Sequence, residues 1–465
     1  MTARSSISSQ AAGAQTQPVS AGWVSKLLEP TDAAWLATLR VLFGLLVSVS
    51  MLRFIAYGWV DRFFVQPRFH FKYWGFGWVE PLPAASMHGL FWVLAALAIM
   101  VAAGGLYRVS APLLAAGLTY IQLIDVTTYL NHYYLAALIA WLLAFCPAQR
   151  IWSVDALLSR SRQPQTVASG VLYLFRFQIA VVYVCAGLAK LQSDWLVHAQ
   201  PLRIWLGSSV ALPVVGELLR WPWVPLALSW AGFLFDSTIV LWLCLRRTRP
   251  YAYALLLVFH ALTRVLFPIG MFPLIMSCAA LVFFSPSWPR RWVRSRVQPA
   301  AGSGGPARRA GLGLGLGYCL VQVLLPLRFA AYGGNVLWHE QGMRFSWRVM
   351  VRAKGGDVTF VVRERAGRTF HVSPRAYLTD LQESEMSSQP DLILQLAQHI
   401  ARDLEQRGHG QVAVYADARV ALNGRRSQPM IDPSVDLTTV RDGLAPAHWV
   451  LPAPEIPPPH TRAVR

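Results

Sequence analysis

A series of long apolar runs restricts what this chain can fold into. The runs cover residues 33–60, 87–106, 112–129, 132–145, 171–191, 224–245, 251–267, 271–284 and 312–329. Each has roughly the length that crosses the hydrocarbon core of a bilayer as a helix. The runs are continuously apolar rather than alternating, which favours helices over the strands of a barrel. With 55% hydrophobic and only 14% charged residues, the sequence predicts an α-helical polytopic membrane bundle of about nine transmembrane helices.

The formal net charge of +19 comes largely from arginines in the links after every second run. They include Arg108, Arg150, Arg160, Arg162, Arg246, Arg247, Arg249, Arg290, Arg291, Arg294 and Arg296. By the positive-inside rule, these links and the N-terminus are expected in the cytoplasm. An odd number of crossings then puts the C-terminal part outside, in the periplasm or the extracellular space. RRM, zinc-finger and helix-turn-helix signatures are absent, so we expect no nucleic-acid partner.

The composition changes along the chain and predicts four parts. They are a disordered cytoplasmic tail at 1–30, a transmembrane domain at 31–332, a small exterior α+β domain at 333–452 and a loose proline-rich tail at 453–465. Within the exterior part, residues 358–363 and 369–373 alternate like a hairpin, and residues 390–407 have a helical period. Residues 411–422 are interpreted as a second pair of strands.

Several ionisable or amide side chains lie within the apolar runs or at their ends. They are Arg40, Asp125, Asn131, His132, Lys190, Asp236, His260 and Arg264. Ionisable groups in a membrane normally face the protein interior and mark a site or a proton relay. Two simpler interpretations stay open: Lys190 can snorkel to the interface, and Asp236 can clamp an arginine of a neighbouring helix. No CxxC or HExxH spacing is present, so no metal site is predicted.

A set of short blocks resembles a known family. The blocks are YRVS (107–110), LIDVTTYLNHYYL (123–135), IWSVDALL (151–158), AGLAKLQSDWL (186–196), FHALTRVLFPIGMF (259–272), SPSWPRR (285–291), LPLR (325–328) and FSWRVMV (345–351). In this order they resemble the vitamin K-dependent gamma-carboxylase family, whose membrane part is the horizontally transferred transmembrane (HTTM) domain. The composition suggests a bacterial homologue.

The resemblance implies an enzyme in which a lysine deprotonates reduced vitamin K, either phylloquinol or menaquinol. The quinol reacts with O2 and supplies a base that removes a γ-proton from glutamate, because no side chain is basic enough to do so. CO2 then adds to the carbon, and vitamin K leaves as the epoxide. This carbon–carbon lyase or ligase chemistry implies quinol and membrane lipid as partners, with a glutamate-containing peptide or protein on the exterior side. The lysine must be uncharged to accept a proton, which burial favours.

The resemblance also suggests residue roles. Lys190, His132 and His260 would be catalytic, and the cofactor-binding set would be Asn131, Asp236, Arg264, Trp338, Trp347 and Arg352. One departure stands out, because Arg352 replaces a histidine of the animal enzymes. Arginine stays protonated and cannot act as a base, although it can stabilise an oxyanion. Full carboxylation therefore stays open.

A different class of function also fits the sequence. The chain could be a non-catalytic HTTM membrane protein that uses its exterior domain for binding, in an immunity or secretion role. This alternative predicts an exposed apolar patch on residues 333–450. The catalytic hypothesis instead predicts that Lys190, His132 and His260 converge on an apolar pocket.

Overall fold

The computed structural model describes residues 22–159, 164–209, 215–293 and 306–458. Most of the expected N-terminal tail and the last residues of the C-terminal tail lie outside these ranges, as do the basic residues Arg160, Arg162, Arg294 and Arg296.

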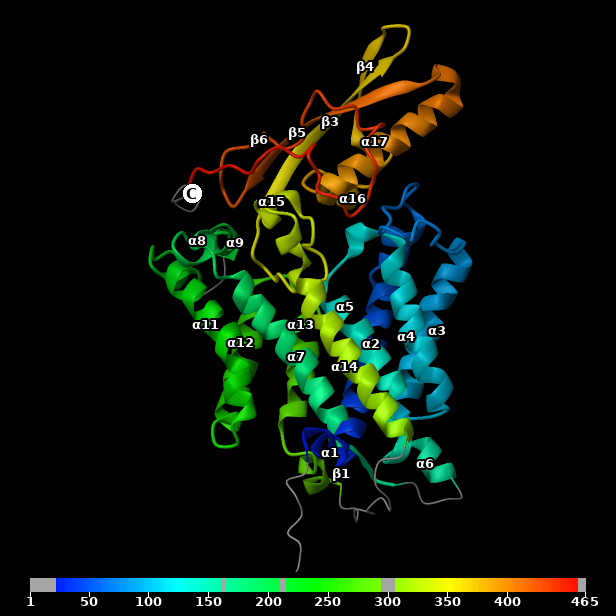
Figure 1. The fold of residues 1–465 in the computed structure, drawn as a ribbon, viewed down its shortest axis with the longest axis vertical. Coiled ribbons are helices and arrows are strands. Elements are labelled where there is room, and N and C mark those ends of the chain that lie inside the picture. Colours follow the sequence, from blue (N-terminus) through cyan, green and yellow to red (C-terminus); the bar gives the residue numbers. More distant parts are fainter. Residues whose placement is uncertain (1–21, 160–163, 210–214, 294–305, 459–465) are drawn as a thin grey trace, which may run out of the picture.

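Within the described ranges, a helix forms in each of the apolar runs, and these helices make one bundle (Figure 1). They are α2 (Ala34–Ala56), α3 (Ala84–Ala103), α4 (Tyr107–Ile124), α5 (Asn131–Phe145), α7 (Ser169–Ala189), α11 (Val224–Cys244), α12 (Arg249–Leu266), α13 (Phe272–Ala279) and α14 (Pro306–Leu327). Among the described residues, five helices are long and apolar enough to cross a membrane, namely α2, α3, α7, α11 and a segment from α14 onward at Ala310–Ala331. The helical bundle is confirmed, but the expected nine crossings are not.

Short elements connect the long helices. They are α1 (Trp23–Leu28), α6 (Val154–Leu158), α8 (Ser193–Leu196), α9 (Leu202–Ser209), α10 (Val215–Leu219), α15 (Val336–His339) and an antiparallel pair of strands, β1 (Pro30–Asp32) and β2 (Thr166–Ala168). The elements α1 and β1 lie at the end of the bundle opposite the C-terminal domain (Figure 1).

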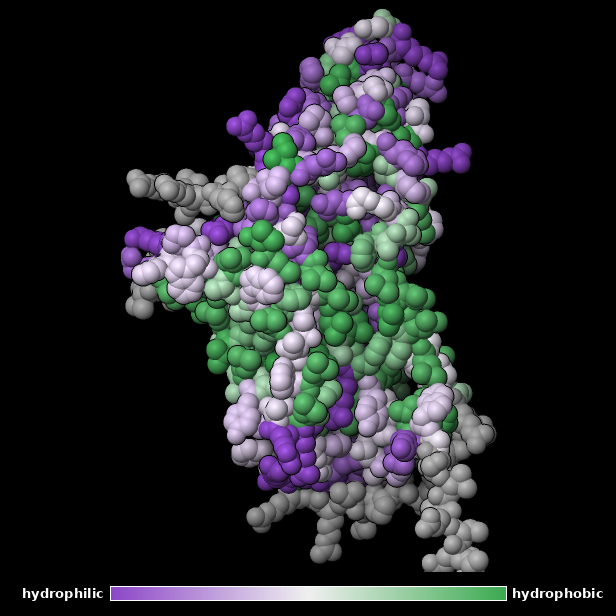
Figure 2. Space-filling model, turned by 60° about the vertical axis from the view of Figure 1, so that its left-hand side comes forward, coloured by the Kyte–Doolittle hydropathy of each residue, from purple (hydrophilic) through white to green (hydrophobic). Residues whose placement is uncertain are grey.

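The surface of the bundle is apolar around its middle. Figure 2 shows a broad hydrophobic band between more polar ends. Exposed apolar side chains on this surface include Leu241, Val258, Leu314 and Leu320. Side chains of this kind are suited to contact with lipid tails. The early arginine of the first run, Arg40, is fully buried and donates to the carbonyls of Ala148 (3.2 Å) and Trp152 (2.5 Å). It faces the protein interior, as expected for an arginine inside an apolar run.

The C-terminal part forms a small α+β layer on top of the bundle (Figure 1). Its antiparallel sheet has the order β4-β3-β5-β6, built from β3 (Lys354–Glu364), β4 (Thr369–Val372), β5 (Val412–Leu422) and β6 (Gln428–Pro429). Two helices, α16 (Asp380–Met386) and α17 (Pro390–Leu404), complete the domain. Apolar side chains of α17 such as Leu396 and Ile400 pack in one core with β5 residues such as Val414. The expected hairpin and helix are confirmed.

One expectation for this domain is wrong. Residues 411–422 do not form a pair of strands, because β5 is a single strand that pairs along its whole length with β3. Its side chains alternate between the core and the solvent face without a break, and Asp417 lies on the solvent face within the strand instead of forming a turn. From the sequence alone, an alternating segment of this length fits either one long strand or two short strands, and the pairing partner decides between them.

A buried polar cluster joins the two parts of the molecule. Asp125, at the end of α4, accepts hydrogen bonds from His70 Nδ1 (3.2 Å) and from Gln382 Nε2 of α16 (2.8 Å). Its other oxygen accepts from the backbone N–H (2.8 Å) and hydroxyl (2.7 Å) of Thr127. A buried carboxylate is tolerated only when its oxygens are satisfied in this way. Asp125 therefore holds the C-terminal domain on the membrane part.

We predict that Asp125→Ala destabilises the protein by about 3 kcal/mol or more, because it leaves His70, Gln382 and Thr127 without their buried acceptor. Thermal unfolding in detergent, with proteolysis of the C-terminal domain as a second readout, measures the effect. The exposed Asp357 on β3 provides the control, since Asp357→Ala removes no buried partner. Equal melting of the two variants would contradict this role of Asp125.

Candidate functional site

Lys190 ends α7 and turns inward instead of snorkelling. Only 5% of the residue is exposed. Its amine donates to Asp236 Oδ2 of α11 (2.7 Å), to the carbonyl of Ala186 (3.2 Å) and to the carbonyl of Val349 (3.4 Å). The amine also lies 5.2 Å from the centre of the Trp195 ring. The partner of Asp236 is therefore the lysine and not an arginine of a neighbouring helix.

An apolar cavity of about 160 Å³, here called the lysine cavity, surrounds this ion pair. Its walls come from α7, α11, α12 and the segment at 349–350. His260 of α12 lines the same cavity, and its Nε2 lies 2.9 Å from the hydroxyl of Tyr183. Its Nδ1 is buried without a hydrogen-bond partner among the described residues. The lysine cavity thus combines one ion pair and one oriented imidazole within apolar walls.

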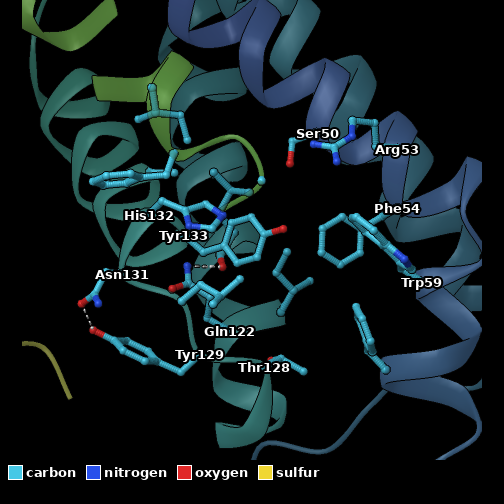
Figure 3. Close-up of a pocket in the computed structure, with 18 of the residues that line it drawn as sticks. Ser50, Arg53, Phe54, Trp59, Gln122, Thr128, Tyr129, Asn131, His132 and Tyr133 are labelled. Atoms are coloured by element: carbon cyan, nitrogen blue, oxygen red, sulfur yellow. Dashed lines mark hydrogen bonds between the residues drawn. The ribbon is translucent and has the colours of Figure 1, made fainter. Parts of the chain in front are cut away.

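A larger cavity of about 500 Å³, here called the histidine cavity, lies next to it (Figure 3). Ser50, Arg53 and Phe54 line one side, and His132 and Tyr133 of α5 line the other. The Tyr133 ring packs 4.3 Å from the His132 ring and 5.8 Å from the Phe54 ring, measured between centroids. No described residue hydrogen-bonds the His132 ring, so this imidazole is available to a ligand in the cavity.

The two cavities share walls. Ile269, Phe272, Val349 and Met350 line both of them. The Phe272 ring centre lies 6.3 Å from that of His132 and 5.9 Å from that of His260. The turn before α13 contains Gly270 at φ +60°, a left-handed residue directly beside the His132 ring. Lys190, Asp236 and His260 therefore share one cavity, while His132 lies across a common wall. The expected convergence of Lys190, His132 and His260 on one pocket thus holds for Lys190 and His260 only.

A third, polar cavity of about 200 Å³ lies under the C-terminal domain and is here called the arginine chamber. Its charged wall residues are Glu340, Arg344, Arg348, Arg352 and Glu385. Asn131 and Glu385 line both this chamber and the histidine cavity, so the two spaces are neighbours.

Ion pairs hold most of the charged groups of the chamber in place. Arg352 pairs with Glu340, which also binds Lys354 Nζ (3.0 Å). Arg344 pairs with Asp391 (2.5 Å). Arg348 instead lies over the Phe329 ring at 4.0 Å, and its Nε is buried without a hydrogen-bond partner among the described residues. A half-buried guanidinium with a buried, unpaired Nε is a suitable receptor for a carboxylate.

The chain that passes between these cavities has an unusual backbone. Four non-glycine residues, Glu340, Phe345, Trp347 and Met350, have φ between 53° and 62°. Left-handed non-glycine residues are costly and are concentrated in functional sites. Sequence patterns do not reveal such conformations, so this signal comes from the structure alone.

Three of the expected cofactor-binding residues lie outside these cavities. Trp338 belongs to the core of the C-terminal domain and donates to the Leu451 carbonyl (2.8 Å). Trp347 is fully buried and stacks on Tyr134 at 4.9 Å. Arg264 is exposed on α12. None of the three lines the lysine cavity, the histidine cavity or the arginine chamber.

Some site residues were missed in the sequence. Tyr183 precedes Lys190 by seven residues, so it lies two turns back on the same face of α7, and this spacing was a usable signal. Arg348 lies in the block FSWRVMV that carries the resemblance, and this was also a usable signal, whereas Glu385 lies in no apolar run and in none of the quoted blocks.

The geometry defines an integral-membrane protein with a polar site enclosed between its helical bundle and a C-terminal cap. Two family models match the chain: the HTTM domain over residues 28–288, and the lumenal domain of vitamin K-dependent gamma-carboxylase over residues 307–455. The chain therefore belongs to the vitamin K-dependent gamma-carboxylase family, and it is a multi-pass membrane protein with a lumenal domain. No solved structure matches it.

The position of Glu385 leads to a prediction about pH. Burial raises the pKa of Glu385 above its ordinary value of 4.5, and the charges of Arg352 and Arg344 oppose this shift only in part. A carboxyl group whose pKa is raised in the folded state stabilises the fold below its unfolded pKa, and this contribution is lost as the pH rises through the folded pKa. Glu385→Gln should therefore gain stability relative to wild type as the pH rises from 4.5 to about 8.

Melting curves across this pH range measure the difference. Glu383→Gln on the same helix removes a partly exposed ion pair with Arg375 and should show no such gain. Melting temperatures of Glu385→Gln that run parallel to wild type over the whole range would contradict the prediction.

Proposed function

We propose that this protein is a vitamin K (quinol)-dependent gamma-glutamyl carboxylase-like enzyme of the membrane. It would couple oxygenation of the quinol to epoxide with γ-proton abstraction from glutamate and addition of CO2. The observation that carries the proposal is the buried Lys190–Asp236 pair (2.7 Å) in an apolar cavity that shares a wall with a larger one. Membership of the family supports the same reaction class.

Lys190 is the proposed base toward the quinol. An ion pair in an apolar cavity carries a large desolvation free energy. Transfer of the proton from Lys190 to Asp236 would give a neutral pair that avoids this cost. The uncharged amine can then accept a proton from a hydroxyl placed beside it. Reduced vitamin K, when bound, supplies the strong base that no side chain provides.

The histidine cavity fits a bicyclic quinol. Its volume of about 500 Å³ falls within the usual range for small-molecule sites. Aromatic and aliphatic side chains such as Phe54 and Met51 line it, and Asn131 and His132 at the start of α5 add polar groups. His132 is proposed to hydrogen-bond a quinol oxygen, and His260, fixed by Tyr183, to move a proton in the lysine cavity. Asn131 completes the polar side of the ligand site.

The arginine chamber is proposed to receive the glutamyl side chain of a peptide or protein from the exterior. Arg348 and Arg352 can hold a carboxylate, although neither can act as a base. Arg352 would thus replace the acid–base chemistry of a histidine with stabilisation of negative charge. Apolar walls at Val349 and Met350 exclude water between the chamber and Lys190.

The proposed topology has nine crossings, a cytoplasmic N-terminus and an exterior C-terminal domain, with parts at 1–30, 31–332, 333–452 and 453–465. The opposite placement of α1 and the C-terminal domain supports an odd number of crossings. For a bacterial member, menaquinol would be the natural quinol. The binding alternative has less support, because Leu444 is the sole exposed large hydrophobic side chain among the described residues of 333–450.

The test is epoxide formation by purified protein in detergent, supplied with reduced vitamin K and O2. We expect epoxide from the wild type and a loss of at least about 100-fold in Lys190→Ala, since a positioned base contributes roughly that factor or more. Lys72→Ala is the matched control, because Lys72 binds Glu80 (3.1 Å) and the Val79 carbonyl (2.5 Å) away from these cavities. Equal epoxide from Lys190→Ala, or none from a folded wild type that binds quinone, would contradict the proposal.

A further inference from the structure

The loop that follows Lys190 is bound by the C-terminal domain. Asp194, four residues after Lys190, lies in α8 and is buried. Its carboxylate accepts hydrogen bonds from Arg425 Nη1 (2.6 Å), Arg425 Nη2 (2.7 Å) and Asn423 Nδ2 (2.8 Å). Burial alone would raise the pKa of Asp194, but the hydrogen bonds from Arg425 and Asn423 bring it below its ordinary value. The carboxylate therefore stays charged in this contact.

Asn423 also binds a second segment. It is fully buried just after β5 and has a left-handed backbone, with φ +52°. Its N–H donates to the Ala353 carbonyl (2.8 Å), and its side-chain oxygen accepts from the Ala353 N–H (2.9 Å). One asparagine thus joins Asp194 to the chain that enters β3 at Lys354.

That chain leads back to the lysine cavity. Val349, four residues before Ala353, accepts a hydrogen bond from Lys190 Nζ (3.4 Å), and Met350 lines the cavity. The contacts therefore form a closed ring that runs from Lys190 to Val349, along the chain to Ala353, through Asn423 to Asp194, and back to Lys190.

The same loop is fixed to the helix that carries Asp236. Trp195 Nε1 donates to the Ser229 carbonyl of α11 (2.8 Å), and the Ser229 hydroxyl donates to the Trp195 carbonyl (2.5 Å). The short helix α8 is therefore held from two sides, by α11 through Trp195 and by the C-terminal domain through Asp194, and the end of α7 at Lys190 lies directly before it.

We infer that Asp194, Asn423 and Arg425 are positioning residues, through which the C-terminal domain holds the Lys190 amine at Asp236. The inference rests on the proposed role of Lys190. The alternative is that the contact between Asp194 and the C-terminal domain only attaches this domain to the bundle. Its loss would then loosen the whole domain, and not only the surroundings of Lys190.

The lysine content of the chain makes a direct test possible. Its lysines are Lys26, Lys72, Lys190 and Lys354. Trace acetylation of the full chain in detergent with acetic anhydride, followed by mass spectrometry, reads the reactivity of each amine in one sample. Lys354 serves as the reference for the C-terminal domain, since its amine is buried against Glu340 (3.0 Å) and the Trp338 carbonyl (2.5 Å).

Asn423→Gly keeps the left-handed backbone and removes the side chain that closes the ring. We expect its Lys190 to be acetylated about tenfold faster than in wild type, because losing a buried charge-assisted hydrogen bond favours local opening by roughly that factor. Lys26, Lys72 and Lys354 should keep their wild-type rates. Asp194→Asn should give the same pattern. Arg425→Lys keeps the charge but loses the two-nitrogen contact with the Asp194 carboxylate, so its Lys190 rate should fall between those of wild type and Asp194→Asn.

Arg419→Gln is the matched control, because Arg419 is an exposed arginine on β5, the strand that ends just before Asn423. An unchanged Lys190 rate in both Asn423→Gly and Asp194→Asn would overturn the inference. So would a joint rise of Lys190 and Lys354, which would indicate a structural tether.

The labelling result is independent of catalysis, so it stands even if wild-type protein forms no epoxide and the proposed function fails. If epoxide does form, Asn423→Gly should lower kcat and leave the KM for quinol within about twofold, because the quinol walls are untouched. A rise in KM with unchanged kcat would place Asn423 in quinol binding and contradict the positioning role.

Discussion

The ion pair between Lys190 and Asp236 is the interaction around which this site is built. It joins α7 to α11 at 2.7 Å within an apolar cavity. A charged pair in such surroundings costs desolvation energy and is tolerated only with good geometry and further hydrogen bonds. The carbonyls of Ala186 and Val349 supply those bonds, and one of them belongs to the C-terminal part of the chain. A structure that only needed two helices joined would gain more from apolar packing, which is why the pair points to chemistry.

The C-terminal domain acts as the upper wall of the site. Val349 and Met350 line both membrane cavities, and Glu385 lines the histidine cavity and the arginine chamber. Buried contacts at Asp125 and Asp194 hold the domain on two separate places of the bundle. The site therefore needs both matched regions, 28–288 and 307–455. A site covered in this way is better shielded from water than an open groove.

The helices could be predicted from the sequence because each apolar run is a local property of the chain. The position of Lys190 could not be predicted in the same way. Its apolar run fits snorkelling as well as burial, and only the tertiary contact with Asp236 decides between them. Arg40 was easier to predict, because an arginine deep in an apolar run has few options other than the interior.

Other features depended on contacts between distant segments. The single strand β5 was interpreted as two strands, because its pairing with β3 is not visible in its own residues. Trp338 matched the family pattern, yet it lies in the core of the C-terminal domain. Glu385 and Asn423 carry no local signal, since their roles arise only when the domain folds onto the bundle. Resemblance to a family suggested Lys190, His132 and His260 as site residues, while the walls and supports of the cavities depend on the fold.

The most direct measurement of the central claim is the absorption spectrum of naphthohydroquinone bound to the protein without oxygen. The spectrum reports the protonation state of the bound ligand before any later chemistry. We predict that wild-type protein binds it in the deprotonated form, and that Lys190→Met binds it in the neutral form. If both proteins bind the neutral form, or both bind the deprotonated form, Lys190 is not the base and the proposed use of this site is wrong.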